Sequence, residues 1–107
     1  MAKSKRAKAC EISTKVRKIV FERDKGNCVL CGRRGNPNSH YIKRSQSGLG
    51  IPENIVTLCP DCHYQYDFGK NCKWYEDRVR EYLKNYYGDS WKEEDLIYDK
   101  WKKYGKI

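Results

Sequence analysis

Apolar positions near the N-terminus recur at helical spacing. They fall at i, i+4, i+7 and i+8 and are Ile12, Val16, Ile19 and Val20. Residues with this spacing share one face of a helix, which predicts a helix over residues 13–23. Gly26 lies just beyond it and is typical of a helix end.

A second apolar stripe lies in the C-terminal third. Its members also share one helical face and are Tyr75, Val79, Tyr82, Leu83 and Tyr86. We expect this helix to end at Gly88. Ser90 and Glu93 then have the spacing of a capping box, which predicts a final helix. Its apolar side would carry Ile97, Trp101 and Tyr104.

The middle of the chain has shorter apolar segments. Residues 40–43 (HYIK) and 55–58 (IVTL) predict two short strands, separated by a loop with two glycines and a proline at 44–54. Pro60 suits the first turn of a helix, which we expect to end at Gly69. The pattern therefore predicts a small α+β fold.

Composition limits what this fold can bury. The chain has 107 residues, of which 38% are hydrophobic, so we expect one domain with a thin core that a structural metal would stabilise. It contains no apolar run long enough to span a membrane, and its basic start lacks the apolar stretch of a secretory signal. We therefore expect a cytoplasmic protein.

The formal net charge of +9 is concentrated at the N-terminus. Residues 1–18 hold seven Lys and Arg against one acidic residue, whereas residues 73–107 hold nine against eight. We expect residues 1–11 to form a basic flexible arm that contacts a phosphate backbone. A solvated tail without a target has the same composition.

Four cysteines have metal-ligand spacing. Cys28 and Cys31 form one C-x-x-C pair, and Cys59 and Cys62 form another after a gap of 27 residues. Two such pairs predict a tetrahedral, structural Zn²⁺ with four thiolate ligands, and a knuckle, hairpin and helix in this order is the treble-clef layout. A disulfide framework is disfavoured in a reducing compartment. The remaining cysteines, Cys10 and Cys72, have no partner spacing and are expected to be free thiols.

Both histidines of the chain lie near these cysteines. His40 begins the first expected strand, and His63 follows Cys62 directly on the expected helix, four residues before Asp67. Positions i and i+4 share a helical face, so His63 and Asp67 can converge on one cation. Two other readings stay open: His63 is an outer or alternative ligand of the zinc, or the two residues are only a surface pair.

The combination of these residues resembles the HNH endonucleases, in particular their phage-type members. The matching segments are HYIKRSQSGLG, IPENIV and LCPDCHYQYD, preceded by VRKIVFERDKGNCVLCG. The resemblance implies a ββα-metal, treble-clef-like core with a four-cysteine zinc site at residues 12–72. An N-terminal helix and two C-terminal helices complete this expected fold, with residues 73–107 packed on the core as a helical extension.

The resemblance also implies roles for single residues. His40 matches the general base that deprotonates the attacking water, and the amide of Asn54 matches the group that bonds the backbone across the long loop. His63 matches a ligand of the catalytic metal, and Asp67 stands where many members have a second ligand. Ser39 departs from the family, because many relatives carry Asp or His there as a further ligand.

These roles imply a metal-dependent DNA endonuclease that hydrolyses phosphodiester bonds. An imidazole of ordinary pKa is a competent base near neutral pH, and one divalent cation (Mg²⁺, Mn²⁺, Ni²⁺ or Zn²⁺) would relieve charge on the leaving oxygen. Lys43 and Arg44 are candidates for phosphate contacts, with ordinary solvated charge as the alternative. The resemblance further implies a place in phage genome processing, beside packaging proteins and in the host cytoplasm. The competing hypothesis is a catalytically inactive, zinc-stabilised module that binds DNA or protein.

Overall fold

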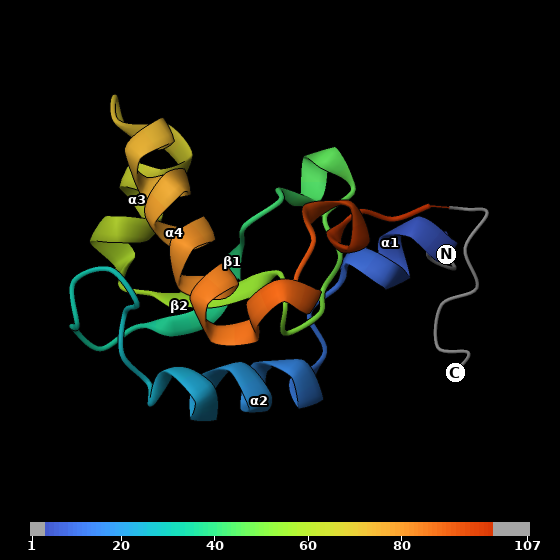
Figure 1. The fold of residues 1–107 in the computed structure, drawn as a ribbon, viewed down its shortest axis with the longest axis horizontal. Coiled ribbons are helices and arrows are strands. Elements are labelled where there is room, and N and C mark those ends of the chain that lie inside the picture. The colour runs from blue at the N-terminus through green and yellow to red at the C-terminus, as the bar shows by residue number, and fades with distance from the viewer. Residues whose placement is uncertain (1–3, 100–107) are drawn as a thin grey trace.

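A computed structural model describes residues 4–99 of the chain. Figure 1 shows its helices and strands in chain order. They are α1 (Lys5–Cys10), α2 (Thr14–Asp24), β1 (Asn36–His40), β2 (Ile55–Leu58), α3 (Pro60–Phe68) and α4 (Cys72–Tyr87). Single 3₁₀ turns lie at Arg44–Gln46, Gly88–Ser90 and Glu93–Leu96. In the described part of the chain, no helix is long and apolar enough to cross a membrane.

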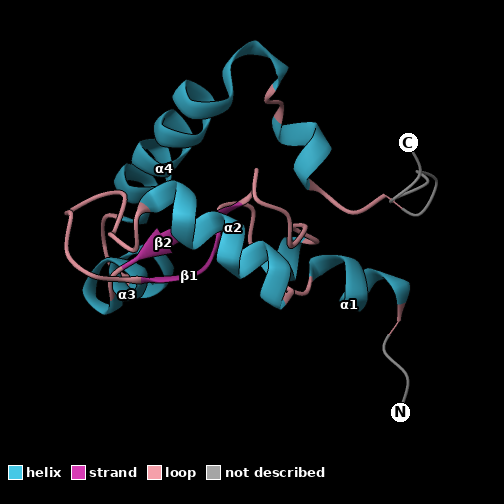
Figure 2. Ribbon diagram, turned by 90° about the horizontal axis from the view of Figure 1, so that it is seen from below, coloured by secondary structure: helices cyan, strands magenta, loops and turns pink. Residues whose placement is uncertain are grey.

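A two-stranded antiparallel sheet lies at the centre of the molecule. β1 pairs with β2 so that His40 lies opposite Ile55 and Ser39 opposite Val56. Helix α2 packs on one side of this sheet, and α3 and α4 lie together on the other (Figures 1 and 2). The small α+β fold with a zinc-type cysteine cluster, expected from the sequence, is confirmed.

Strand β2 and helix α3 lie where the sequence predicts them. All four residues of β2 are buried, which explains their uninterrupted apolar character apart from Thr57. Helix α3 begins at Pro60, whose missing N–H costs nothing in the first turn, and its C-cap is Gly69. Helix α4 buries Val79 and Leu83 completely, as the apolar stripe predicts.

The first strand lies earlier than expected. It covers Asn36–His40, so His40 ends the strand instead of beginning it. The reason is that β2 is only four residues long and its partners lie before position 41. Beyond His40 the backbone of Ile42 pairs with the side chain of Asn54, not with a strand.

The expected final helix is reduced to one 3₁₀ turn, Glu93–Leu96, within the described residues. The Ser90 hydroxyl donates to the Tyr87 carbonyl and caps no helix. Residues 96–98 bind instead to the long loop between β1 and β2 (residues 41–54). Leu49 N donates to Leu96 O at 2.8 Å, and Tyr98 N donates to Ser47 O at 2.8 Å. Trp101 and Tyr104 lie outside the described residues.

The N-terminal segment differs from the flexible arm that we expected over residues 1–11. Lys5–Cys10 form helix α1, capped by the Ser4 hydroxyl, which accepts from Ala7 N at 3.1 Å. The side chain of Cys10 is buried, and Gly50 N donates to Ala9 O at 2.9 Å. These contacts with the long loop stabilise a helix that is too short to be stable by itself.

A buried polar cluster ties α2 to the sheet and to α4. The Asp24 carboxylate accepts two hydrogen bonds from the Arg23 guanidinium, at 2.7 and 2.9 Å. It also accepts from Thr57 N at 3.0 Å and from the Tyr82 hydroxyl. Because this carboxylate is 0% exposed and fully paired, the cluster fixes how the helices sit around the sheet.

Candidate functional site

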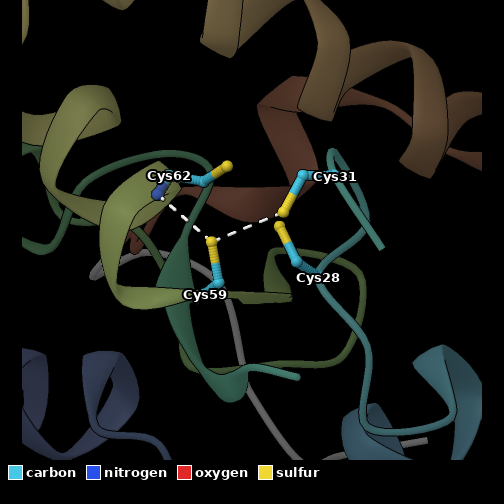
Figure 3. A group of neighbouring side chains, drawn as sticks. All are labelled: Cys28, Cys31, Cys59 and Cys62. Atoms are coloured by element: carbon cyan, nitrogen blue, oxygen red, sulfur yellow. Dashed lines mark hydrogen bonds between the residues drawn. The ribbon is translucent and has the colours of Figure 1, made fainter. Parts of the chain in front are cut away.

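Four cysteines come together, two from the chain after α2 (Cys28 and Cys31) and two from the start of α3 (Cys59 and Cys62). Their sulfur atoms all lie within 4.8 Å of one another, and Figure 3 shows them pointing into one space. The Sγ atoms of Cys31 and Cys59 are 3.5 Å apart. Ligands of a tetrahedral Zn²⁺ at about 2.3 Å lie about 3.8 Å from each other, so this donor set fits a structural zinc ion.

The backbone around the cluster favours the thiolate of Cys28. Burial by itself would raise the pKa of Cys28, but hydrogen bonds from the backbone N–H groups of Cys59, Cys31 and Leu30 lower it to about 7. Burial and the neighbouring sulfurs raise the pKa of Cys62. Four thiolates in so small a space therefore require a cation, which is the chemistry of a zinc site with no open position.

The histidine next to this cluster faces a different partner. His63 Nε2 lies 3.2 Å from Asp67 Oδ2, one turn along α3, and both side chains are about one-third exposed at 33%. Within the part of the chain that the structure describes, the group of three or more metal-ligating side chains is the four cysteines alone. The geometry therefore turns His63 toward Asp67 and not into the zinc cluster.

The spacing of His63 and Asp67 fits a shared cation. Two ligands of one octahedral divalent ion at about 2.1 Å lie about 3.0 Å apart, close to the 3.2 Å between these two atoms. The second oxygen of Asp67, Oδ1, accepts from Lys43 Nζ at 2.7 Å. Lys43 also lies 4.3 Å from the centre of the Tyr66 ring, so its ammonium group is held beside the carboxylate.

A hollow of about 250 Å³ brings His40 to the same place. Its lining comes from β1, the turn after it and α3, and comprises Asn38, His40, Lys43, Arg44, Ser45, His63 and Asp67. At about 30 Å³ for each water, the hollow has room for a phosphate group and several waters. The sequence-predicted residues His40, His63, Asp67, Lys43 and Arg44 thus line one space.

The His40 imidazole is held by the N-terminal segment. Its Nε2 atom lies 2.9 Å from the carbonyl oxygen of Cys10. Burial lowers the pKa of His40 below its ordinary value of 6.5, and the charges of Arg44 and His63 lower it further, while the hydrogen bond to Cys10 opposes them. His40 therefore stays neutral to a lower pH than an exposed histidine does.

Asn54 holds the loop that follows His40. The side chain is 0% exposed, and its Oδ1 accepts from Ile42 N at 2.8 Å. Its Nδ2 donates to Ile42 O at 3.1 Å and to Leu49 O at 2.8 Å. These are the backbone contacts across the loop that the resemblance implied. Gly48 is required beside them, because a Cβ there would lie 1.7 Å from Ile42 O.

A second hollow, of about 450 Å³, adjoins the first. The two share Asn38, His40 and Arg44, and Arg17 and Glu11 line the second one. The two hollows therefore form a continuous, mainly basic surface that passes over His40. Arg17 was not predicted from the sequence, because an exposed arginine on a helix gives no signal until the fold places it.

The residue before His40 does not reach the hollow. Ser39 is 1% exposed and lies between the sheet and the core, whereas Asn38 lines both hollows with His40. The Asn38 Oδ1 atom is buried and has no hydrogen-bond partner among residues 4–99. Alternation along a strand would have identified Asn38 as the companion of His40, had the strand been placed at residues 36–40.

Comparisons with known proteins found one matching family model and two relatives of similar sequence. The family model for HNH endonuclease matches residues 28–67. The type IV methyl-directed restriction enzyme EcoKMcrA of Escherichia coli is 34% identical over 68 residues, which are 54% of this chain and 24% of that enzyme. Anaredoxin of a Nostoc species is 33% identical over 58 residues, which are 52% of this chain and 76% of that protein.

A solved structure has the same fold. The type IV phosphorothioation-dependent restriction endonuclease ScoMcrA superposes with a TM-score of 0.63 over 81% of this chain, at 19% sequence identity. This chain covers 19% of ScoMcrA, and the match to EcoKMcrA covers about a quarter of that enzyme. The similarity is therefore confined to one part of each of these two much longer restriction enzymes.

Proposed function

Because this chain belongs to the HNH endonuclease family, we propose that it is a metal-dependent DNA endonuclease that hydrolyses phosphodiester bonds. One observation carries the proposal: His40, His63 and Asp67 line a single hollow large enough for a phosphate. A base on a strand then faces a cation site on a helix, which is the arrangement that hydrolysis by an activated water requires.

His40 is the proposed general base. Its Nε2 faces a carbonyl oxygen, so the proton of the neutral ring resides there and Nδ1 accepts the proton of the attacking water. The lowered pKa keeps this nitrogen unprotonated at neutral pH. Asn54 contributes indirectly, because its three hydrogen bonds hold the loop on which the base and the phosphate-facing residues depend.

His63 Nε2 and Asp67 Oδ2 are the proposed ligands of one divalent cation. When bound, such a cation supplies an electrophile for the phosphoryl oxygens and neutralises charge on the leaving 3′ oxygen. Lys43 and Arg44 line the same hollow and are placed to bind phosphate oxygens. Lys43 also balances the charge of Asp67 through Oδ1, and so leaves Oδ2 for the cation.

The proposed substrate is DNA bound mainly through phosphates, with little reading of base sequence. The described surface near His40 carries arginine and lysine side chains, which suit this mode of binding. The words methyl-directed and phosphorothioation-dependent describe EcoKMcrA and ScoMcrA, of which this chain matches a quarter or less. A function in phage genome processing, and the packaging proteins as partners, stay predictions from the resemblance.

A plasmid-cleavage assay tests the proposal. Purified protein is incubated with supercoiled DNA and, in separate reactions, Mg²⁺, Mn²⁺, Ni²⁺ or Zn²⁺. We expect nicked or linear product with the wild type and a fall on the order of 10²- to 10⁴-fold in His40→Ala, which removes the base. Asp61→Asn is the matched control, because Asp61 lies on α3 and its side chain is 85% exposed, away from the hollow.

If the protein is instead a zinc-stabilised binding module, the same experiment should show DNA binding without cleavage. Wild type and His40→Ala would then retain DNA equally in a gel-shift assay, and neither would cleave it with any of the four cations. That result would remove the nuclease proposal. Retained zinc and a native circular dichroism spectrum must accompany it, so that misfolding is not mistaken for inactivity.

A further inference from the structure

We propose that helix α1 is part of the catalytic centre, because the backbone carbonyl of Cys10 positions His40. The inference rests on the proposed function, in which His40 is the general base. It concerns a segment that the sequence alone presents as a basic arm. Cys10 acts here through its main chain, as a positioning residue for the imidazole and not as a catalytic residue.

The contact between Cys10 and His40 selects one state of the imidazole ring. The Nε2 atom lies 2.9 Å from Cys10 O. A carbonyl oxygen carries no proton, so Nε2 must donate, and in the neutral ring Nδ1 then holds the lone pair. The same hydrogen bond fixes the rotation of the ring. The contact therefore determines both which nitrogen acts as the base and where it points.

Close backbone packing places the Cys10 carbonyl at this point. Gly50, in the long loop after His40, donates from its N–H to Ala9 O at 2.9 Å. A Cβ at position 50 would lie 2.0 Å from Glu11 O and 3.1 Å from Cys10 O. Since backbone atoms cannot move aside as a flexible side chain can, only glycine allows the segment to lie so close.

The other end of α1 is attached to the same loop. Arg6 Nε donates to Ser47 Oγ at 2.8 Å, and Arg6 Nη2 donates to Arg44 O at 3.1 Å. A helix of six residues has too few internal hydrogen bonds to persist in water, so its order depends on these contacts. A substitution that weakens them is expected to withdraw the Cys10 carbonyl from His40 while the chemical identity of every residue that lines the hollow beside His63 is kept.

Histidine tautomers report the contact directly. Full-length protein with ¹⁵N-labelled histidine gives long-range ¹H–¹⁵N spectra in which the protonated nitrogen of each ring is identified, with His40→Ala for assignment. We expect His40 of the wild type to carry its proton on Nε2. Gly50→Ala should show both tautomers and a cleavage rate lower by roughly tenfold to a hundredfold, since a base in the wrong tautomer is ineffective.

Arg6→Gln and Lys8→Gln form a matched pair, because each removes one positive charge from α1. Of these two side chains, that of Arg6 donates hydrogen bonds to Ser47 and Arg44, so Arg6→Gln should shift the tautomer ratio and lower the turnover of bound DNA more than Lys8→Gln does. Lys8→Gln should keep the Nε2–H tautomer even where DNA affinity falls. If Gly50→Ala fails to fold, judged by zinc content and circular dichroism, the Arg6 and Lys8 pair decides.

Two results would overturn the inference. One is an Nε2–H tautomer that persists in both Gly50→Ala and Arg6→Gln. The other is a shifted tautomer with unchanged cleavage. A wild type that shows the expected tautomer but cleaves no DNA with any cation contradicts the proposed function instead, so the two failures are distinguishable.

Discussion

Helix α3 carries two groups of side chains that can ligate a metal, and the two groups differ in how enclosed they are. At its start, Cys59 and Cys62 join two cysteines from another segment, and three of the four side chains are buried. His63, directly after Cys62, and Asp67, one turn beyond it, face an open hollow and are about one-third exposed. The first group leaves a cation no free position, whereas the second leaves most of them free.

Under the proposed function, this difference separates stability from chemistry on a single helix. A closed set of four thiolates can hold a fold together but cannot bind a substrate. An open pair of ligands contributes little to stability but lets water and a phosphate approach the ion. Because α3 carries the cysteines and also the proposed ligands His63 and Asp67, the cysteine site would fix the position of the proposed cation site. Variants at the cysteines should then unfold the protein, whereas variants at His63 or Asp67 should lower activity and leave the fold intact.

The largest effect is expected at the closed end. Cys59→Ser removes one zinc ligand but keeps a side chain that can cap α3, so it tests the metal alone. Structural zinc ions contribute on the order of 10 kcal/mol to small domains. We expect loss of bound zinc and of the cooperative unfolding transition, measured by metal analysis and circular dichroism. Cys72→Ser is the control, since its hydroxyl can still donate to the Gly69 carbonyl, and a folded Cys59→Ser protein would contradict the assignment.

At the open end the fold should survive and the activity should not. His63→Ala or Asp67→Asn removes one proposed ligand of the divalent cation, which is worth several kcal/mol in the transition state, so cleavage should fall about a hundredfold or more. Titration with Mn²⁺ in the absence of DNA should show weaker binding. The zinc content and melting temperature should stay at wild-type values, and an unfolded variant would refute the division between the two ends.

A smaller effect is expected from Lys43, which pairs with Asp67 and is a proposed phosphate ligand. In Lys43→Gln, Asp67 Oδ1 loses its cationic partner at 2.7 Å, so Mn²⁺ should bind a few-fold more tightly without DNA. DNA affinity should fall a few-fold, and less at high salt, because a phosphate contact is lost. Arg33→Gln is the control, because it breaks an exposed ion pair with Asp61, which lies on α3 like Asp67. It should change neither the Mn²⁺ affinity nor the DNA affinity beyond a general charge effect.

The smallest effect concerns pH. Burial lowers the pKa of His40, so the acidic limb of the cleavage profile should have its midpoint below the ordinary value of 6.5. The free energy of unfolding should fall over the same pH range. As pH falls, the unfolded chain binds this proton at a higher pH than the folded chain does, so folding is weakened between about 6.5 and the folded pKa of His40. A profile of kcat/KM against pH, with the limb at or above 6.5, would argue against a buried base.

Local patterns predicted the elements that contain the two sites, but not all of their contacts. The four residues of β2, together with Pro60 and Gly69, predicted the correct bounds of the strand and helix, because strand burial and helix ends depend on nearby residues. The predicted start of β1 was wrong because pairing depends on the length of a distant partner. Within the described residues, the predicted final helix is only the 3₁₀ turn Glu93–Leu96, because residues 96–98 bond to the long loop.

The spacing of the cysteines was sufficient to identify the closed site, since each C-x-x-C pair brings two sulfurs together wherever the chain goes. Helical periodicity likewise placed His63 beside Asp67. No local rule brings His40 and Lys43 to that helix, exposes Asn38 in preference to Ser39, or carries the Cys10 carbonyl across 30 positions to an imidazole. Those contacts exist because strands pair and backbones pack over long separations, and such energies belong to the folded chain and not to any short stretch of it.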